Sequence, residues 1–169
     1  MKQRMRTIDR LLELSALALF LCSLVYLYWW YDALPDQIAI HFDAQGKADG
    51  WDSKGSMIVL PLIMGFVIAL LAMLGRYLPI EAWSFPGQYS EQKMQYYTLA
   101  RTLLHGMQFS IGFISVFAVW SMVRFNLAEN PVENNRDLWV SLSAIGLPIV
   151  LYFVQYFKVR KNENSSDRP

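Results

Sequence analysis

The residues best suited to chemistry lie close together between the first two apolar runs of the sequence. His41 and Asp43 are two positions apart in a segment whose alternation predicts a strand, so their side chains would point to one face. Asp49 and Asp52 follow a turn-like segment and could fold back toward them. An imidazole and several carboxylates are suitable ligands for a divalent cation.

The spacing of these carboxylates does not match a calcium-binding EF-hand loop. Counted from Asp43, the third and fifth positions are not acidic, and the twelfth is Lys54, where a bidentate Glu is required. A structural role is favoured over a metal site. In that role Asp49 or Asp52 accepts backbone N–H groups or pairs with Lys54, and a hydrogen bond of His41 closes the loop. We therefore expect neither a metal nor another cofactor.

A second polar pair, His105 and Gln108, lies one helical turn apart in a later apolar run. A titratable group inside a membrane is a functional candidate. Arg101, one turn earlier, places the pair near the membrane surface, so interfacial hydrogen bonding is favoured over a proton path. No nucleophile with a base and an orienting residue is recognisable, so we expect no catalytic residue and no enzyme activity.

The composition indicates which elements must hold these residues. The chain of 169 residues is 54% hydrophobic and only 17% charged, which is too apolar for an ordinary soluble domain. The excess of hydrophobic residues lies in four charge-free runs, at residues 14–31, 55–75, 102–123 and 138–157. Each run matches a bilayer core of about 30 Å at about 1.5 Å per residue. This excludes a soluble catalytic domain, a disordered chain and a secreted disulfide scaffold.

The sequence therefore predicts an all-α membrane protein with four transmembrane helices, at about residues 8–31, 55–76, 90–124 and 137–158. Residues 1–169 are expected to form a single integral membrane domain. The connection 32–54 is predicted to be a small ordered loop with a short strand or hairpin. Residues 38–43 alternate between apolar and polar or small side chains, and glycines follow in turn-like surroundings.

Basic residues indicate the orientation. With both termini in the cytoplasm, eleven of the 15 Lys and Arg residues fall on the cytoplasmic side and four outside, as the positive-inside rule favours. The connection 32–54 holds five aspartates against two lysines and then lies outside. We expect a multi-pass protein of the bacterial inner membrane, surrounded by the lipid bilayer.

An acidic, ordered loop flanked by aromatic side chains predicts a binding site at the outer surface. Opposite charge would speed encounter with a cationic or amphipathic peptide, and the aromatic rings would supply apolar contact. No nucleic-acid partner is expected. The candidate ligand-binding residues are Pro35, His41, Phe42, Asp43, Gly46, Asp49, Gly50, Trp51 and Lys54.

The same segment resembles a known family. The residues that carry the resemblance are Leu34 and Pro35, Ile40 to Phe42, Gly46, Asp49 and Gly50, Lys54, and then Leu60 and Pro61. In this order they resemble the signature of a bacterial membrane domain of unknown function, found at the front of SdpI-type immunity proteins. The chain departs from it at Asp43, where the family often has Asn. The resemblance implies resistance to a toxic peptide, and for SdpI-type proteins also sequestration of a transcriptional repressor at the membrane.

Three functions therefore stand side by side. The first is an SdpI-like immunity or sensing protein that binds a toxin peptide or other ligand outside and a cytoplasmic regulator inside. The second is a small structural subunit of a larger membrane complex. The third, favoured least, is a metal-dependent membrane enzyme that uses His41 with Asp43, Asp49 or Asp52.

Overall fold

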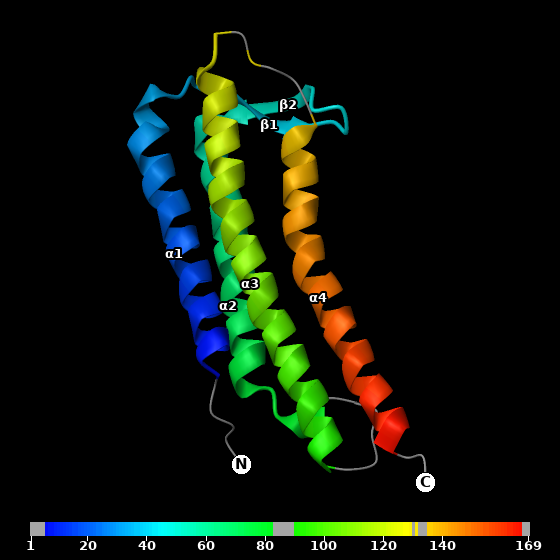
Figure 1. The fold of residues 1–169 in the computed structure, drawn as a ribbon. Helices are drawn as coiled ribbons and strands as arrows, with labels where there is room; N and C mark the ends of the chain where they lie inside the picture. Colours follow the sequence, from blue (N-terminus) through cyan, green and yellow to red (C-terminus); the bar gives the residue numbers. More distant parts are fainter. Residues whose placement is uncertain (1–5, 83–89, 130, 132–134, 167–169) are drawn as a thin grey trace.

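Four long helices form a bundle, and a two-stranded hairpin lies at one end of it (Figure 1). The computed structural model describes residues 6–82, 90–129, 131 and 135–166. The start of α1 and the end of α4 lie at the end opposite the hairpin. The helices are α1 (Thr7–Trp30), α2 (Val59–Tyr77), α3 (Ser90–Leu127) and α4 (Arg136–Ser166), and the strands are β1 (Gln37–Phe42) and β2 (Ala48–Ser53).

All four helices are long and apolar enough to cross a membrane, which confirms the predicted fold class. Three boundaries differ from the expected ones, the smallest difference being at the end of α3, which is Leu127 rather than about residue 124. A 3₁₀ turn at Lys54–Ile58 precedes α2, which starts at Val59, and Pro61 follows in the first turn, where a missing N–H breaks no helical bond. The last helix continues to Ser166 rather than ending near 158, because hydropathy marks the edge of the apolar segment and not the end of a helix. The tail beyond that residue lies outside the described residues.

Small residues bring α1 against α3, the most extensive helix pair. A Cβ added to Gly112 would lie 2.7 Å from the carbonyl oxygen of Ala16, so only glycine allows this approach. One turn farther along α3 and two turns farther along α1, the hydroxyls of Ser115 and Ser23 are 2.9 Å apart and buried. Close backbone approach and interhelical hydrogen bonds drive helix association in lipid, where apolar burial contributes little.

The α4 helix is held more loosely. It packs mainly against α3, and none of its described side chains is buried. Ser110 donates a hydrogen bond of 2.6 Å to the carbonyl of Ala144, and Gly106 faces Pro148 across the same contact. One cavity between α3 and α4 is lined in part by these four residues, and a second lies nearer the hairpin.

The hairpin shares a core with the helix ends. Strands β1 and β2 are antiparallel, and Ile38 of β1 is fully buried. The predicted strict alternation is wrong in one respect, because Ile38 and Ala39 are both buried whereas Ile40 is 37% exposed. The pairing register shifts on either side of His41, and such irregularities re-aim side chains. The core residues are Leu27, Leu34, Ile38, Met57, Val119 and Val123.

Candidate ligand-binding site

The hairpin turn is ordered by the carboxylate of Asp43. Its Oδ1 accepts hydrogen bonds of 2.9 Å from the backbone N–H groups of both Gln45 and Lys47. Gly46 adopts a φ of 84°, a left-handed conformation that glycine enters without the steric cost of a Cβ. The sequence assigned this amide-accepting role to Asp49 or Asp52. The structure gives it chiefly to Asp43, while Asp52 accepts from the N–H of Ser53 at 2.7 Å.

His41 and Asp49 face each other across the hairpin, as the structural interpretation of the loop predicted for the histidine. The His41 Nδ1 and Asp49 Oδ1 atoms are 2.5 Å apart, and the two side chains are 72% and 46% exposed. Gly50 makes room for this pair, since a Cβ there would lie 2.8 Å from the Cβ of His41. The pair is therefore available to solvent or to a ligand.

The base of the hairpin is closed by Lys54. Its ammonium lies 3.3 Å from a carboxylate oxygen of Asp36, and its backbone N–H donates to the carbonyl of the same residue at 3.0 Å. The ammonium also lies 5.6 Å from the ring centre of Tyr31. The expected pairing of this lysine with Asp49 or Asp52 is wrong. The pairing of the two strands places Lys54 beside Asp36, just before the start of β1.

The described residues contain no group of three or more His, Cys, Asp and Glu side chains that could hold a metal ion. Among the described residues, His41 is hydrogen-bonded to Asp49, while Asp43 and Asp52 accept from backbone amides instead. The arrangement offers a hydrogen-bonded pair and no recognisable metal centre within the described part of the chain.

A pocket of about 470 Å³ opens between the hairpin and the neighbouring ends of α3 and α4. Phe42 forms one wall, with its ring 4.8 Å from that of Phe125 in an edge-on arrangement. Four of the predicted site residues line the pocket: His41, Phe42, Asp43 and Gly46. The other five do not line it: Asp49, Gly50 and Trp51 lie on β2, Pro35 precedes β1, and Lys54 begins the 3₁₀ turn after β2. The remaining lining comes from Ile40, Ala44, Phe117, Ala118, Ser121, Met122, Phe125, Asn135, Asp137, Leu138 and Ser141.

Two polar residues of this region were missed by the sequence reasoning. Asn126, at the end of α3, accepts a hydrogen bond from the N–H of Ala39 at 2.7 Å and donates to its carbonyl at 3.1 Å. Asp137, in the first turn of α4, accepts a hydrogen bond from Ser121. The signal that could have found them is a polar side chain at the edge of an apolar run. Only the fold shows that Asn126 and Asp137 both lie on the hairpin side of the bundle.

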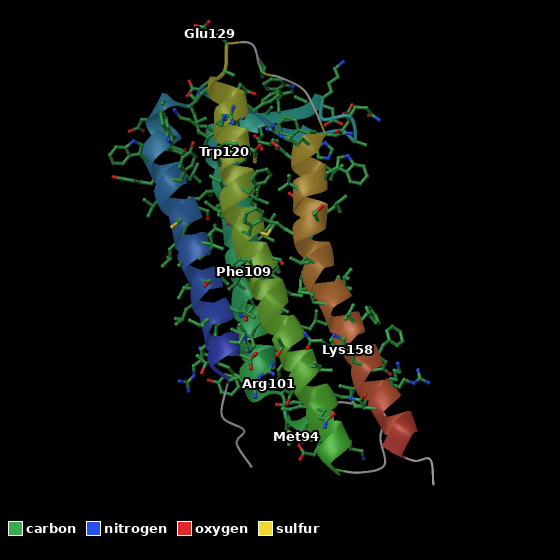
Figure 2. The ribbon with its side chains drawn as sticks, viewed as in Figure 1. Met94, Arg101, Phe109, Trp120, Glu129 and Lys158 are labelled. Atoms are coloured by element: carbon green, nitrogen blue, oxygen red, sulfur yellow. The ribbon has the colours of Figure 1, made fainter. Side chains whose placement is uncertain are left out.

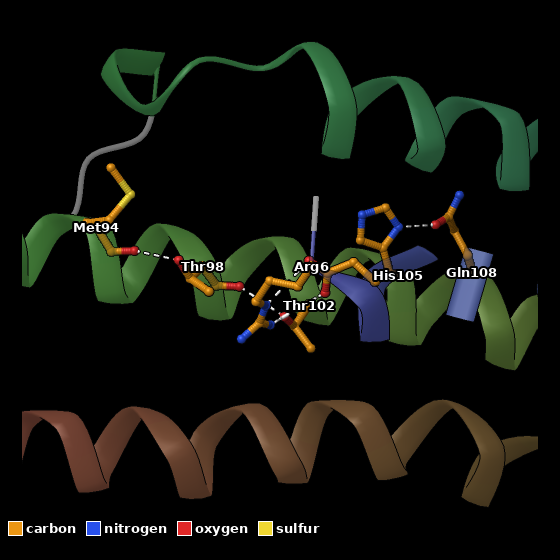
Figure 3. Close-up of polar contacts among 7 residues, drawn as sticks. Arg6, Met94, Thr98, Thr102, His105 and Gln108 are labelled. Atoms are coloured by element: carbon orange, nitrogen blue, oxygen red, sulfur yellow. Dashed lines mark hydrogen bonds and ion pairs between the residues drawn. The ribbon is translucent and has the colours of Figure 1, made fainter. Parts of the chain in front are cut away.

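The other polar pair, His105 and Gln108, is fully buried in the bundle. The expected hydrogen bonding is present, and the position of the pair near the membrane surface stays a prediction. Figure 3 shows both side chains pointing from α3 toward α2. His105 Nδ1 lies 2.7 Å from Gln108 Oε1, and Gln108 donates to the carbonyl of Ile68 at 3.0 Å. Gly75 makes room for the imidazole of His105. A Cβ added to Gly75 would lie 3.1 Å from the Cε1 atom of that ring. The pair thus links α3 to α2 by a hydrogen bond.

The fold and the pocket define a multi-pass membrane protein with a folded hairpin outside the spanning helices. Residues 18–65 match the family described as Domain of unknown function (DUF1648). The matched segment runs from within α1, across the whole hairpin, into α2. No curated protein and no solved structure matches the chain. The resemblance to a membrane domain of unknown function is thus supported, while the kinship with SdpI-type immunity proteins stays a prediction.

Proposed function

We propose that this protein is a bacterial inner-membrane receptor of the SdpI-like immunity or sensing type, which binds a cationic, amphipathic peptide at the outer surface. The pocket of about 470 Å³ beneath the hairpin is the observation that supports this most directly. Its volume lies in the range of roughly 300–1,000 Å³ typical of ligand pockets. It has room for a few side chains of a peptide rather than for a whole helix.

Apolar side chains at the helix ends suit the oily face of such a peptide. Phe117, Met122 and Phe125 of α3 and Leu138 of α4 line the pocket. These positions lie at the hairpin ends of spanning helices, where a peptide that approaches the bilayer would first arrive. Aromatic and methionine side chains are common in such contact surfaces.

Acidic groups at the same pocket favour a cationic ligand. The Oδ1 atom of Asp137 is buried and accepts no hydrogen bond from the described residues; the Arg136 Nε atom lies 3.7 Å away. This oxygen has an ion pair with Arg136 but no hydrogen bond, so a ligand ammonium or guanidinium that donates a hydrogen bond there would be stabilised. Asp43 adds a second negative charge to the lining.

The proposed sidedness follows from the basic residues, eleven of which would lie on the cytoplasmic side with the chain ends. A cytoplasmic regulator would then meet that basic end. We propose binding without catalysis.

Binding can be measured with the full chain in nanodiscs of zwitterionic lipid. The probe is a fluorescent amphipathic Lys/Leu peptide, and the comparison is a Glu/Leu peptide of the same length. We expect tighter binding of the Lys/Leu peptide than of its acidic counterpart, beyond that to empty nanodiscs. Asp137→Asn keeps an acceptor for Ser121 but removes the charge, and should weaken binding by roughly tenfold or more.

The matched control is Asp32→Asn, which removes an exposed acidic charge that does not line the pocket. Equal losses in the two variants, or no binding above that of empty nanodiscs, would contradict the proposed site. The immunity role has a separate test in cells. Expression should raise the survival of a sensitive strain exposed to a toxin peptide encoded beside this gene, and unchanged survival would remove that role.

A further inference from the structure

A second cavity, of about 500 Å³, lies between α3 and α4 in the part of the bundle nearer the chain ends. It shares no lining residue with the pocket beneath the hairpin. We propose that this cavity binds an anionic phospholipid, with an acyl chain between the helices and the phosphate near Arg6 and Lys158.

The walls of the cavity suit an acyl chain. They are formed largely by apolar side chains such as Leu103, Phe109 and Leu147. The lining on α3 runs from Leu99 to Phe113, about 20 Å at 1.5 Å per residue, and so covers the depth of one leaflet, which is about 15 Å. Apolar walls without a neighbour lose dispersion contacts, and they do not hold water. In a bilayer the nearest apolar chain is a lipid tail.

The end of the cavity nearer the chain ends is polar. Thr102, Tyr152 and Gln155 line it there. Tyr152 and Gln155 carry hydroxyl and amide donors, whereas the hydroxyl of Thr102 already donates to Asp9 or to the carbonyl of Thr98. Arg6 reaches the same wall, because its guanidinium donates a hydrogen bond to Thr102. Figure 3 shows Arg6 beside Thr102, away from the side of α3 that carries His105. Arg6 shares its charge with the buried Asp9, at 3.4 Å, so a phosphate needs a further cation.

Lys158 supplies that cation. The α4 residues that line the cavity include Ala144, Leu147, Leu151 and Gln155, spaced by three or four positions, and Lys158 is the next member of this stripe. Lys158 is exposed, and no described carboxylate lies within ion-pair distance of it. In Figure 2 it lies nearer the chain ends than Phe109 does. A lysine there can lay its stem along the groove and reach the headgroup level.

Native mass spectrometry of the full chain in mild detergent tests this site. The probes are dioleoyl phosphatidylglycerol and dioleoyl phosphatidylcholine, which share their tails and differ in net charge. We expect the anionic lipid to bind more tightly. Lys158→Gln should reduce this preference by about fivefold, the effect of one basic residue near an anionic headgroup. The control Arg160→Gln removes the same charge about 200° around α4 and should leave the preference unchanged.

A second pair of variants tests the groove itself. Leu151→Trp places a larger ring in the cavity, whereas Val150→Trp adds the same ring at a neighbouring exposed position that does not line it. The Leu151 variant should lose both lipids, and the Val150 variant should keep them. Equal affinity for the two lipids, together with no effect of Lys158→Gln, would overturn the proposal. Loss of a dimer signal in the Leu151 variant would also overturn it, since the groove would then hold a second copy of the chain.

Discussion

The side-chain amide of Asn126 joins the hairpin to the helical bundle through both of its polar atoms. It bonds the N–H and the carbonyl of Ala39, a residue with no exposed surface. The His41–Asp49 pair on the same hairpin is shorter but largely exposed. Buried polar partners matter more than exposed ones, because water cannot replace a buried partner once it is lost.

We expect Asn126→Ala to lower the free energy of unfolding by about 1–3 kcal/mol, because the polar backbone groups of Ala39 lose their partner. Thermal unfolding in detergent and amide hydrogen exchange of β1 would measure this. The control Gln37→Ala truncates an exposed amide side chain of the same strand. Similar exchange rates in the two variants would show that the amide of Asn126 does not hold the hairpin.

His41→Ala removes an exposed polar contact of the hairpin, in contrast to the buried contact that Asn126→Ala removes. Because the hydrogen-bonded pair with Asp49 is exposed, its loss should cost at most about 1 kcal/mol of stability. Hydrogen exchange of the hairpin should therefore stay close to that of the unmodified protein, and binding of the Lys/Leu peptide can be measured on an intact fold. Unfolding of the hairpin in this variant would contradict a surface role for the pair.

At the scale of elements, the contact between α1 and α3 depends on a glycine. A Cβ at Gly112 would meet backbone atoms of Ala16 at 2.7 and 3.0 Å, and backbone cannot rotate aside as a side chain can. Gly146 in α4 has open space, with nothing within 4 Å of an added Cβ. The two glycines thus carry different constraints although both lie in spanning helices.

Gly112→Ala should destabilise the bundle by roughly 1–3 kcal/mol, the usual cost of overpacking. Gly146→Ala should be neutral or stabilise by up to about 1 kcal/mol, since alanine favours the helix and meets no neighbour. Denaturant titration in one detergent compares the two. A larger loss for the Gly146 variant would mean that α4, rather than the α1–α3 contact, limits stability.

For the whole molecule, the hairpin lies at one end of the bundle, and the start of α1 and the end of α4 lie at the other (Figure 1). The membrane therefore separates the acidic hairpin from the basic chain ends, whichever way the protein is inserted. The proposed function requires the hairpin outside, where a peptide arrives, and the proposed lipid site then belongs to the inner leaflet.

Labelling of cysteine variants in intact cells tests this orientation. In a Cys22→Ser background, an impermeant maleimide should label Gln45→Cys in the hairpin turn, whereas Lys161→Cys near the end of α4 should react only after permeabilisation. The reverse pattern would place the pocket in the cytoplasm and remove the receptor proposal.

Much of the fold was predictable because its signals are local. An apolar run of suitable length must be a helix if it crosses lipid, since every backbone polar group needs an internal partner there. The hairpin was predictable from its turn residues, among them Gly46 with its positive φ. The partners of the charged residues of the hairpin were not predictable from the sequence. Lys54 and Asp36 meet only because the strands pair, and Ile38 and Ala39 are both buried only because the register shifts.

The sequence by itself determined the four spans, the ordered hairpin and the separation of charge along the chain, because each depends on neighbouring residues or on the thickness of a bilayer. Only the tertiary structure decided that His105 lies between two helices, that Asn126 holds β1, and that Asp137 borders the pocket. These side chains contact residues that are far away in the sequence, and such contacts form only when the helices pack.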